Sequence, residues 1–142
     1  MIALVALLAA QAHAESVEIY LALEPEGVAE SWTVDHADVG ALVHETIERG
    51  PREHLEVTVD LTERLEHDGQ VDQVVFEATI ERVQTDRRGR EVREVLSRPR
   101  VTTLSDTEAV VKQGARDRRG EMVSGLELRI VPRLDDDVPT LP

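Results

Sequence analysis

Residues 55–83 read LEVTVDLTERLEHDGQVDQVVFEATIERV, and this stretch decides the fold. Its first half alternates apolar with polar residues, which is the period-2 pattern of a strand with one buried and one solvent-facing side. A second alternating run follows Asp68-Gly69-Gln70, which has the composition of a turn. The apolar residues that share the buried side are Leu55, Val57, Val59, Leu61, Leu65, Val74, Phe76, Ala78 and Ile80. The stretch therefore predicts a long β-hairpin with one face in the core.

The turn of this hairpin allows two registers. A two-residue turn at Asp68-Gly69 places Asp60 opposite Glu77, and like charges that face each other across a ladder cost about 0.2 to 1 kcal/mol per pair. A turn at Gly69-Gln70 instead places Asp60 opposite Thr79. The electrostatic cost favours the second register, and both registers keep the same residues buried.

Residues 37–49, which precede the hairpin, predict an amphipathic helix. The apolar residues at i, i+3, i+4 and i+8 spacing form one stripe and are Val39, Leu42, Val43 and Ile47. Asp35 or Asp38 can cap the N-terminus of this helix, and Gly50-Pro51 is a C-terminal stop signal.

The rest of the chain predicts further strands, at residues 16–23, 31–34, 91–97, 100–104, 109–112 and 122–131. Asp86-Arg87-Arg88-Gly89 recurs as Asp117-Arg118-Arg119-Gly120. Asp at the first and Gly at the fourth position favour a type I turn that closes a bulged hairpin. The recurrence is either a short internal repeat or two independently chosen turns.

These elements predict an α+β fold, mainly an antiparallel β-sheet of about six to eight strands with one amphipathic helix near residues 37–49. The alternative is a β-sandwich with the helix as a lid. Residues 15–134 are expected to form a single β-rich domain, and residues 135–142, with three consecutive aspartates and two prolines, a flexible tail.

Residues 1–14, MIALVALLAAQAHA, resemble a secretory signal, with an apolar run followed by Ala12-His13-Ala14. Cleavage after Ala14 would give a periplasmic or secreted protein. The basic start of a signal peptide is missing, so the alternative, a first strand or helix of a cytosolic protein, stays open. No other run is long enough to cross a bilayer as a helix, so we expect no integral membrane insertion. The chain has no cysteine, which excludes a disulfide framework.

The net charge of −13 argues against nucleic acid, whose phosphates need clustered cations, and against anionic membrane surfaces. Aromatic residues are few. Tyr20, Trp32 and Phe76 are the three in the sequence, which weakens a case for a carbohydrate or base-stacking surface.

The histidines, serines and acids form no recognisable catalytic motif. His44-Glu45 begins like a zinc-protease motif but lacks the second histidine four residues on. The other histidines after residue 14 are His36, His54 and His67, and the serines Ser31, Ser97, Ser105 and Ser124 stand at no recognisable motif spacing from any of them. Asp135-Asp136-Asp137 lacks the spaced ligands of a calcium loop. The sequence therefore predicts no catalytic, cofactor-binding or metal-binding residues, no cofactor and no enzyme.

Residues 95–134 read VLSRPRVTTLSDTEAVVKQGARDRRGEMVSGLELRIVPRL. This segment resembles the C-terminal β-module of the secretins, the outer-membrane channels of secretion systems and type IV pili, and residues 76–83 resemble the strand that opens it. The matching positions are Leu96, Ser97, Pro99, Thr103, Leu104, Ala109, Gly114, Gly125, Leu126 and Pro132. Eleven positions separate the two glycines, where secretins have a longer, membrane-embedded segment, so the resemblance implies a soluble relative without the pore.

The expected function is that of a non-catalytic, exported interaction module, an accessory of envelope assembly or secretion that binds a protein partner through strand edges or its acidic face. One alternative is a small hydrolase or metal-binding protein that uses carboxylates with His44 or His54. Another is a homo-oligomer whose edge strands close a ring. An unpaired edge between Arg100 and Lys112 would support the module, whereas His and carboxylate side chains clustered in a concave site would support the enzyme.

Overall fold

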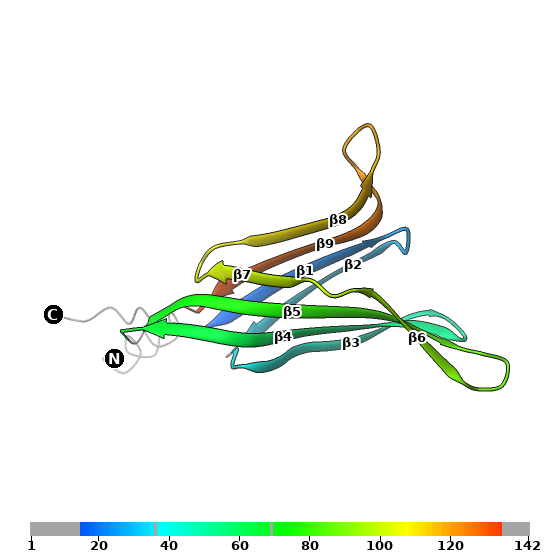
Figure 1. Cartoon of the computed structure of the whole chain (residues 1–142), viewed down its shortest axis with the longest axis horizontal. Helices are drawn as coiled ribbons and strands as arrows, with labels where there is room; N and C mark the ends of the chain where they lie inside the picture. The colour runs from blue at the N-terminus through cyan, green and yellow to red at the C-terminus, as the bar shows by residue number, and fades with distance from the viewer. Residues whose placement is uncertain (1–14, 36, 69, 135–142) are drawn as a thin grey trace, which may run out of the picture.

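The computed structural model describes residues 15–35, 37–68 and 70–134. In these ranges the chain forms nine strands in two antiparallel sheets and contains no helix (Figure 1). The four-stranded sheet has the order β2-β1-β9-β8, and the five-stranded sheet has the order β3-β4-β5-β6, with β7 pairing with β5 beyond the end of β6. The strands are β1 (Ser16–Glu24), β2 (Val28–Asp35), β3 (Gly40–Gly50), β4 (Glu53–His67), β5 (Gln70–Thr85), β6 (Glu91–Ser97), β7 (Arg100–Leu104), β8 (Ala109–Arg116) and β9 (Met122–Arg133).

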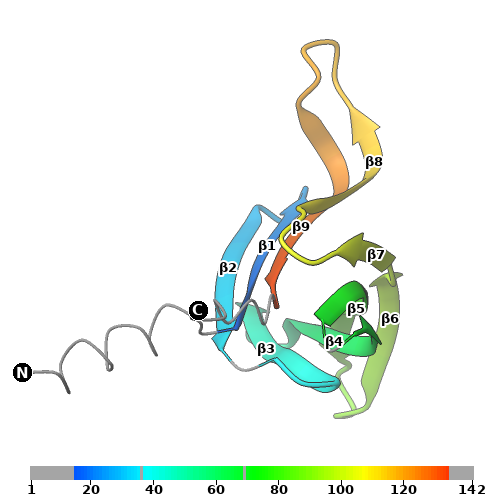
Figure 2. The same ribbon diagram turned by 90° about the vertical axis from the view of Figure 1, so that its left-hand side faces the viewer.

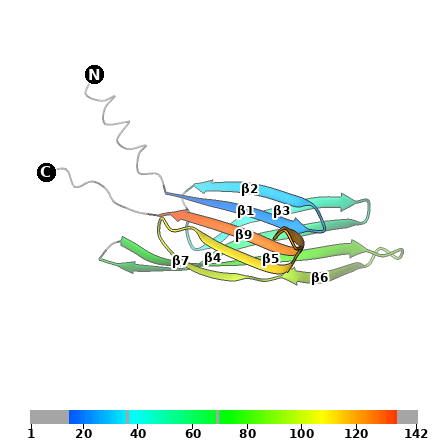
Figure 3. The ribbon, with the colours of Figure 1, turned by 90° about the horizontal axis from the view of Figure 1, so that it is seen from above.

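The two sheets pack against each other as a β-sandwich, the predicted alternative (Figures 2 and 3). The core lies between them and is made by alternate residues of the four central strands, as period-2 patterning requires. The largest contributors are Val17, Ile19, Leu21, Leu55, Val57, Leu61, Phe76, Ile80, Leu126, Leu128 and Ile130, each at most 2 % exposed. The predicted hairpin is therefore confirmed, and so is its buried face at every predicted residue except Leu65.

Leu65 departs from this pattern and is 43 % exposed. The pairing of β4 with β5 shifts by one residue between Leu61 and Glu63, and the Thr62 hydroxyl donates to the Val75 carbonyl there. Because one extra residue turns every following side chain to the other face, Leu65 points to solvent and Arg64 takes the inward position.

The helix predicted at residues 37–49 is wrong. Residues 40–50 form β3, an edge strand whose Val43 lies opposite Val59 and whose Ile47 lies opposite Leu55. Val43 and Ile47 are four residues apart, so they share a face in a strand as well as in a helix. The strand additionally supplies ladder hydrogen bonds to β4, whereas a lone helix of this length is marginal in water. Gly50-Pro51, the predicted helix stop, begins the tight turn between β3 and β4.

The preferred register of the hairpin is also wrong. His67 pairs with Gln70, which is the register of the alternative that was not preferred, and Asp68 has a φ of 52°, as the first central residue of a type I′ turn requires. Asp60 consequently faces Glu77, and Glu56 faces Glu81. The second of these like-charged pairs is bridged by an arginine of β6, a contact that the hairpin sequence alone does not contain.

Both Asp-Arg-Arg-Gly turns form as predicted and have the same geometry. In the first, the Gly89 N–H donates to the Asp86 carbonyl at 3.1 Å, and Gly89 has a φ of 79°. In the second, the Gly120 N–H donates to the Asp117 carbonyl at 3.1 Å, and Gly120 has a φ of 81°. These turns close the β5–β6 and β8–β9 hairpins, which extend as two arms from the same end of the sandwich (Figure 1). The predicted signal at residues 1–14 and the tail at residues 135–142 lie outside the described residues.

Candidate functional site

The sandwich has an open seam between β8, the last strand of one sheet, and the β6–β7 edge of the other. A turn of four residues, 105–108, joins β7 to β8, and the two strands lie close together there. Within the described ranges β8 pairs with β9 alone, and residues 112–116 are exposed. The described part of the chain therefore has an unpaired edge of the kind that would support the module, and it lies on β8 and extends to Arg116.

The hydrogen-bonding groups that β8 presents to the seam can be assigned from Pro132. The Pro132 carbonyl accepts from the Asp106 N–H at 2.6 Å, on the β8 side of β9. Backbone groups alternate in direction along a strand, so the N–H and C=O groups of Ile130 and Leu128 also point toward β8. There these two residues pair with Ala109 and Val111. The backbone groups of the intervening β8 residues, Val110, Lys112 and Gly114, consequently point away from β9 toward the free edge.

Gly114 and Gly125 mark the point at which the β8–β9 hairpin leaves the sandwich. They pair directly across the two strands and have φ values of 117° and 115°. A Cβ built on Gly114 would overlap the Ser124 carbonyl oxygen, and one built on Gly125 would overlap the carbonyl oxygen of Gln113. The backbones thus approach more closely than any side chain permits, which explains why both positions are glycine.

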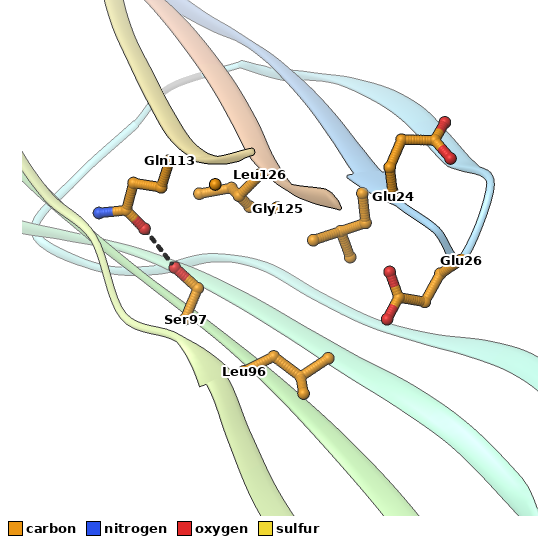
Figure 4. A pocket seen from close by; sticks show the side chains of 9 residues that line it. Glu24, Glu26, Leu96, Ser97, Gln113, Gly125 and Leu126 are labelled. Atoms are coloured by element: carbon orange, nitrogen blue, oxygen red, sulfur yellow. Dashed lines mark hydrogen bonds between the residues drawn. The ribbon is translucent and has the colours of Figure 1, made fainter. Parts of the chain in front are cut away.

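A cleft of about 330 Å³ opens beside this glycine pair (Figure 4). Its apolar walls come from Leu23 of β1, Leu96 of β6 and Leu126 of β9. The Ser97 hydroxyl donates to Gln113 Oε1 at 2.8 Å, and this bond links β6 to β8 across the seam. The volume lies within the range of about 300 to 1,000 Å³ that small-ligand sites occupy, and the mixture of apolar walls with a few polar groups is typical of such sites.

Two carboxylates, Glu24 and Glu26, lie on the opposite side of the cleft from this hydrogen bond (Figure 4). Glu26 is 3.0 Å from Arg82 Nη2, an ion pair that ties the turn between β1 and β2 to β5. Glu24 has no ion pair within the described part of the chain. The mouth of the cleft therefore carries a carboxylate, that of Glu24, whose negative charge no ion pair in the described part of the chain balances.

The outer face of the five-stranded sheet carries a separate charged cluster. Arg93 Nη1 donates to Glu56 Oε2 at 2.7 Å and to Glu81 Oε2 at 3.1 Å. The hydrogen bond from the Arg93 guanidinium lowers the pKa of Glu56; burial acts in the opposite direction, and His54, with Nε2 3.3 Å from Glu56 Oε1, adds to the lowering. The two carboxylates in turn raise the pKa of Arg93. This cluster stabilises the register of the hairpin, because Arg93 sits between two carboxylates that would otherwise face each other.

The histidines and serines considered from the sequence do not converge. His44 is exposed on β3, His54 belongs to the Arg93 cluster, and His36 and the side chain of His67 lie outside what the structure describes. Ser97 lines the cleft, whereas Ser31 lies on β2. Ser105 accepts a hydrogen bond from the Leu134 N–H, and Ser124 belongs to the β8–β9 ladder. Among the described residues no group of three or more His, Asp or Glu side chains could hold a metal ion.

Sequence reasoning did not identify the cleft, because its walls come from β1, β6, β8 and β9. One signal was available. A glycine inside a strand pattern indicates a close backbone approach, and residues 109–131 contain two such glycines, Gly114 and Gly125. Of the positions that carry the secretin resemblance, Leu96, Ser97, Gly114, Gly125 and Leu126 all line the cleft.

No helix in the described part of the chain is long and apolar enough to cross a membrane. No protein-family model, no curated protein and no solved structure matches this chain, so its resemblance to the secretins remains a prediction.

Proposed function

We propose that this chain is a non-catalytic protein-binding module that adds an extended segment of its partner to the free edge of β8. The observation that carries the proposal is the row of outward-pointing backbone groups on Val110, Lys112 and Gly114. Strand addition satisfies such groups by main-chain hydrogen bonds, and pockets for alternate side chains then provide specificity.

The exposure of β8 favours it over the edge strand β3 as the binding strand. Val110 is 43 % exposed, and the residues from Lys112 to Arg116 are exposed. A partner strand can therefore approach β8 from solvent to the spacing of about 4.8 Å that separates paired strands. The edge strand β3, by contrast, contains a bulge between Ala41 and Val43 and another between Glu48 and Gly50. Bulges interrupt an edge and discourage pairing.

The sequence supports the two remaining parts of the proposal, which are the cell compartment of the protein and the class of its partner. The apolar start of the chain and its resemblance to the secretin β-module support an exported, periplasmic protein and a partner from envelope assembly or secretion. The net charge of −13 favours a partner segment with basic residues.

Proline at position 112 tests the mode of binding. Lys112→Pro removes an N–H that points to the free edge and leaves the ladder to β9 intact, since proline is tolerated on edge strands. Lys112→Ala removes the same side chain and keeps the N–H, so it is the matched control. Denaturant unfolding of both variants establishes that each one is folded.

The immobilised chain and the two variants are then used to capture proteins from an envelope fraction of the source organism. The proposal predicts that the unmodified chain and Lys112→Ala enrich the same secretion or pilus component, and that Lys112→Pro does not. Equal capture by Lys112→Pro would contradict strand addition at β8. Enrichment of no secretion or pilus component would remove the proposed partner class.

A further inference from the structure

The cleft beside Gly114 and Gly125 lies on the path of a strand added to β8. Gln113 points inward from β8 and lines the cleft, as do Leu96 and Ser97 from the other side of the seam. Residues that pair across a ladder project to the same face, with Cβ atoms about 4.5 to 5.5 Å apart. The partner residue opposite Gln113 would consequently point into the cleft.

The lining of the cleft indicates which side chain fits there. Leu23 and Leu126 are 3 % and 2 % exposed, and Leu96 packs against the core beside them. A volume of about 330 Å³ equals that of roughly eleven waters, which is room for one large side chain. Leu96, which is only partly buried, offers the apolar surface that an aliphatic or aromatic side chain in the cleft would cover, and that side chain would gain the free energy of its own burial.

The charge at the mouth of the cleft indicates a second preference. Glu24 lines the cleft and has no ion pair among the described residues, whereas Glu26 is paired with Arg82. Side chains two positions apart in a strand share a face and lie about 6.8 Å apart, which is less than a Debye length, so a residue two positions from the apolar anchor can interact with a charge at the mouth of the cleft. A lysine or arginine at that position is attracted to the carboxylate.

We propose that the cleft is the anchor pocket of the β8 edge and that it selects a partner segment with one large apolar residue and a lysine or arginine two positions away. The inference rests on the proposed function, because strand addition is what delivers the anchor residue to the cleft. The occupant is an extended peptide segment of another protein.

Selection from a display library of random peptides tests this inference. The peptides are roughly ten residues long, enough to span β8, and the full chain is the bait. We expect the selected peptides to share an aliphatic or aromatic residue with a basic residue two positions away. Their affinity should fall roughly ten- to hundredfold on Leu96→Asp, which places a charge in the cleft, because the burial of one large apolar side chain contributes that much.

Two further variants separate the cleft from general effects. Leu104→Asp is the matched control, since Leu104 is 58 % exposed on β7 and lies outside the cleft, and it should leave affinity unchanged. Glu24→Lys should reverse the charge preference toward Asp or Glu without affecting the apolar anchor. This reversal does not depend on Leu96 and therefore tests the inference even if Leu96→Asp fails to fold.

The outcomes distinguish the two proposals. Peptides that depend on the edge, as shown by lost binding to Lys112→Pro, but share no apolar residue would overturn the anchor pocket and leave strand addition standing. Peptides that bind Lys112→Pro as well as the unmodified chain would overturn strand addition. Selection of no peptide at all would overturn both.

Discussion

Replacing Gly125 by alanine should destabilise the protein by about 2 to 5 kcal/mol. A residue other than glycine at a φ of 115° costs about 1 to 3 kcal/mol. The new Cβ would also lie 2.6 Å from the Gly114 Cα and overlap the Gln113 carbonyl oxygen. Both of these atoms belong to backbone, so no side-chain rotation relieves the overlap. The strands must separate, which costs about 0.5 to 1.5 kcal/mol for each ladder hydrogen bond lost.

Denaturant unfolding gives the free-energy change, and amide hydrogen exchange shows whether the loss is confined to the β8–β9 arm. Gly50→Ala is the matched control. Gly50 also lies in a strand, but its φ is outside the left-handed region, and the Cβ of an alanine there would meet no heavy atom within 4 Å. The control should change stability by no more than about 0.5 kcal/mol. If Gly125→Ala matches the control both in the free energy of unfolding and in the amide hydrogen exchange of the β8–β9 arm, the close approach at this glycine pair is refuted.

Three other substitutions test the charged contacts and one turn. Arg93→Met should lower stability above pH 4.5 and progressively less below it. The folded-state pKa of Glu56 lies below its ordinary 4.5, so the stability that the ionised Glu56 gains from Arg93 is present above pH 4.5 and is lost on acidification. Unfolding measured from about pH 3 to about pH 7 follows the effect. Asp60→Lys should stabilise the protein by up to about 1 kcal/mol, because it replaces a like-charged pair with Glu77 by an opposite-charged one, and thermal unfolding measures the gain. Asp117→Ala should cost about 1 kcal/mol in denaturant unfolding, since its carboxylate accepts two backbone N–H bonds at 2.8 and 2.9 Å.

Each of these substitutions has a control variant. Arg98→Met removes an exposed arginine that has no ion pair in the described part of the chain, and it should show no pH-dependent loss. Asp60→Asn removes the repulsion without adding attraction, so it should give a smaller gain than lysine. Arg118→Ala lies in the same turn as Asp117 and should be nearly neutral. A loss for Arg93→Met that is equal at both ends of the pH range would show that Glu56 is not held by this arginine.

The segment at residues 40–50 shows where sequence periodicity is ambiguous. The spacing of Val43 and Ile47 fits one face of a helix and one face of a strand equally well. The open edge of β4, the next strand along the chain, makes the strand the better solution, because it offers ladder hydrogen bonds and an apolar surface. A prediction from local pattern has no access to that partner.

The register of the hairpin shows the same limit for charge. Within the hairpin the pairing of Glu56 with Glu81 is unfavourable, and this repulsion argues for the other turn. Arg93, contributed by β6, lies 2.7 and 3.1 Å from the two carboxylates and offsets the repulsion. The energy that separates the two registers is on the order of 1 kcal/mol, so a single cation from a third strand is enough to decide between them.

By itself, the sequence determined which side of each central strand is buried and where the two Asp-Arg-Arg-Gly turns fall, because alternation and turn chemistry are encoded in neighbouring residues. The tertiary structure alone decided the strand at residues 40–50, the register of the β4–β5 hairpin, and the cleft that Leu23, Leu96 and Leu126 form. These features depend on contacts between different strands, and the alternatives differ locally by too little free energy for neighbouring residues to choose among them.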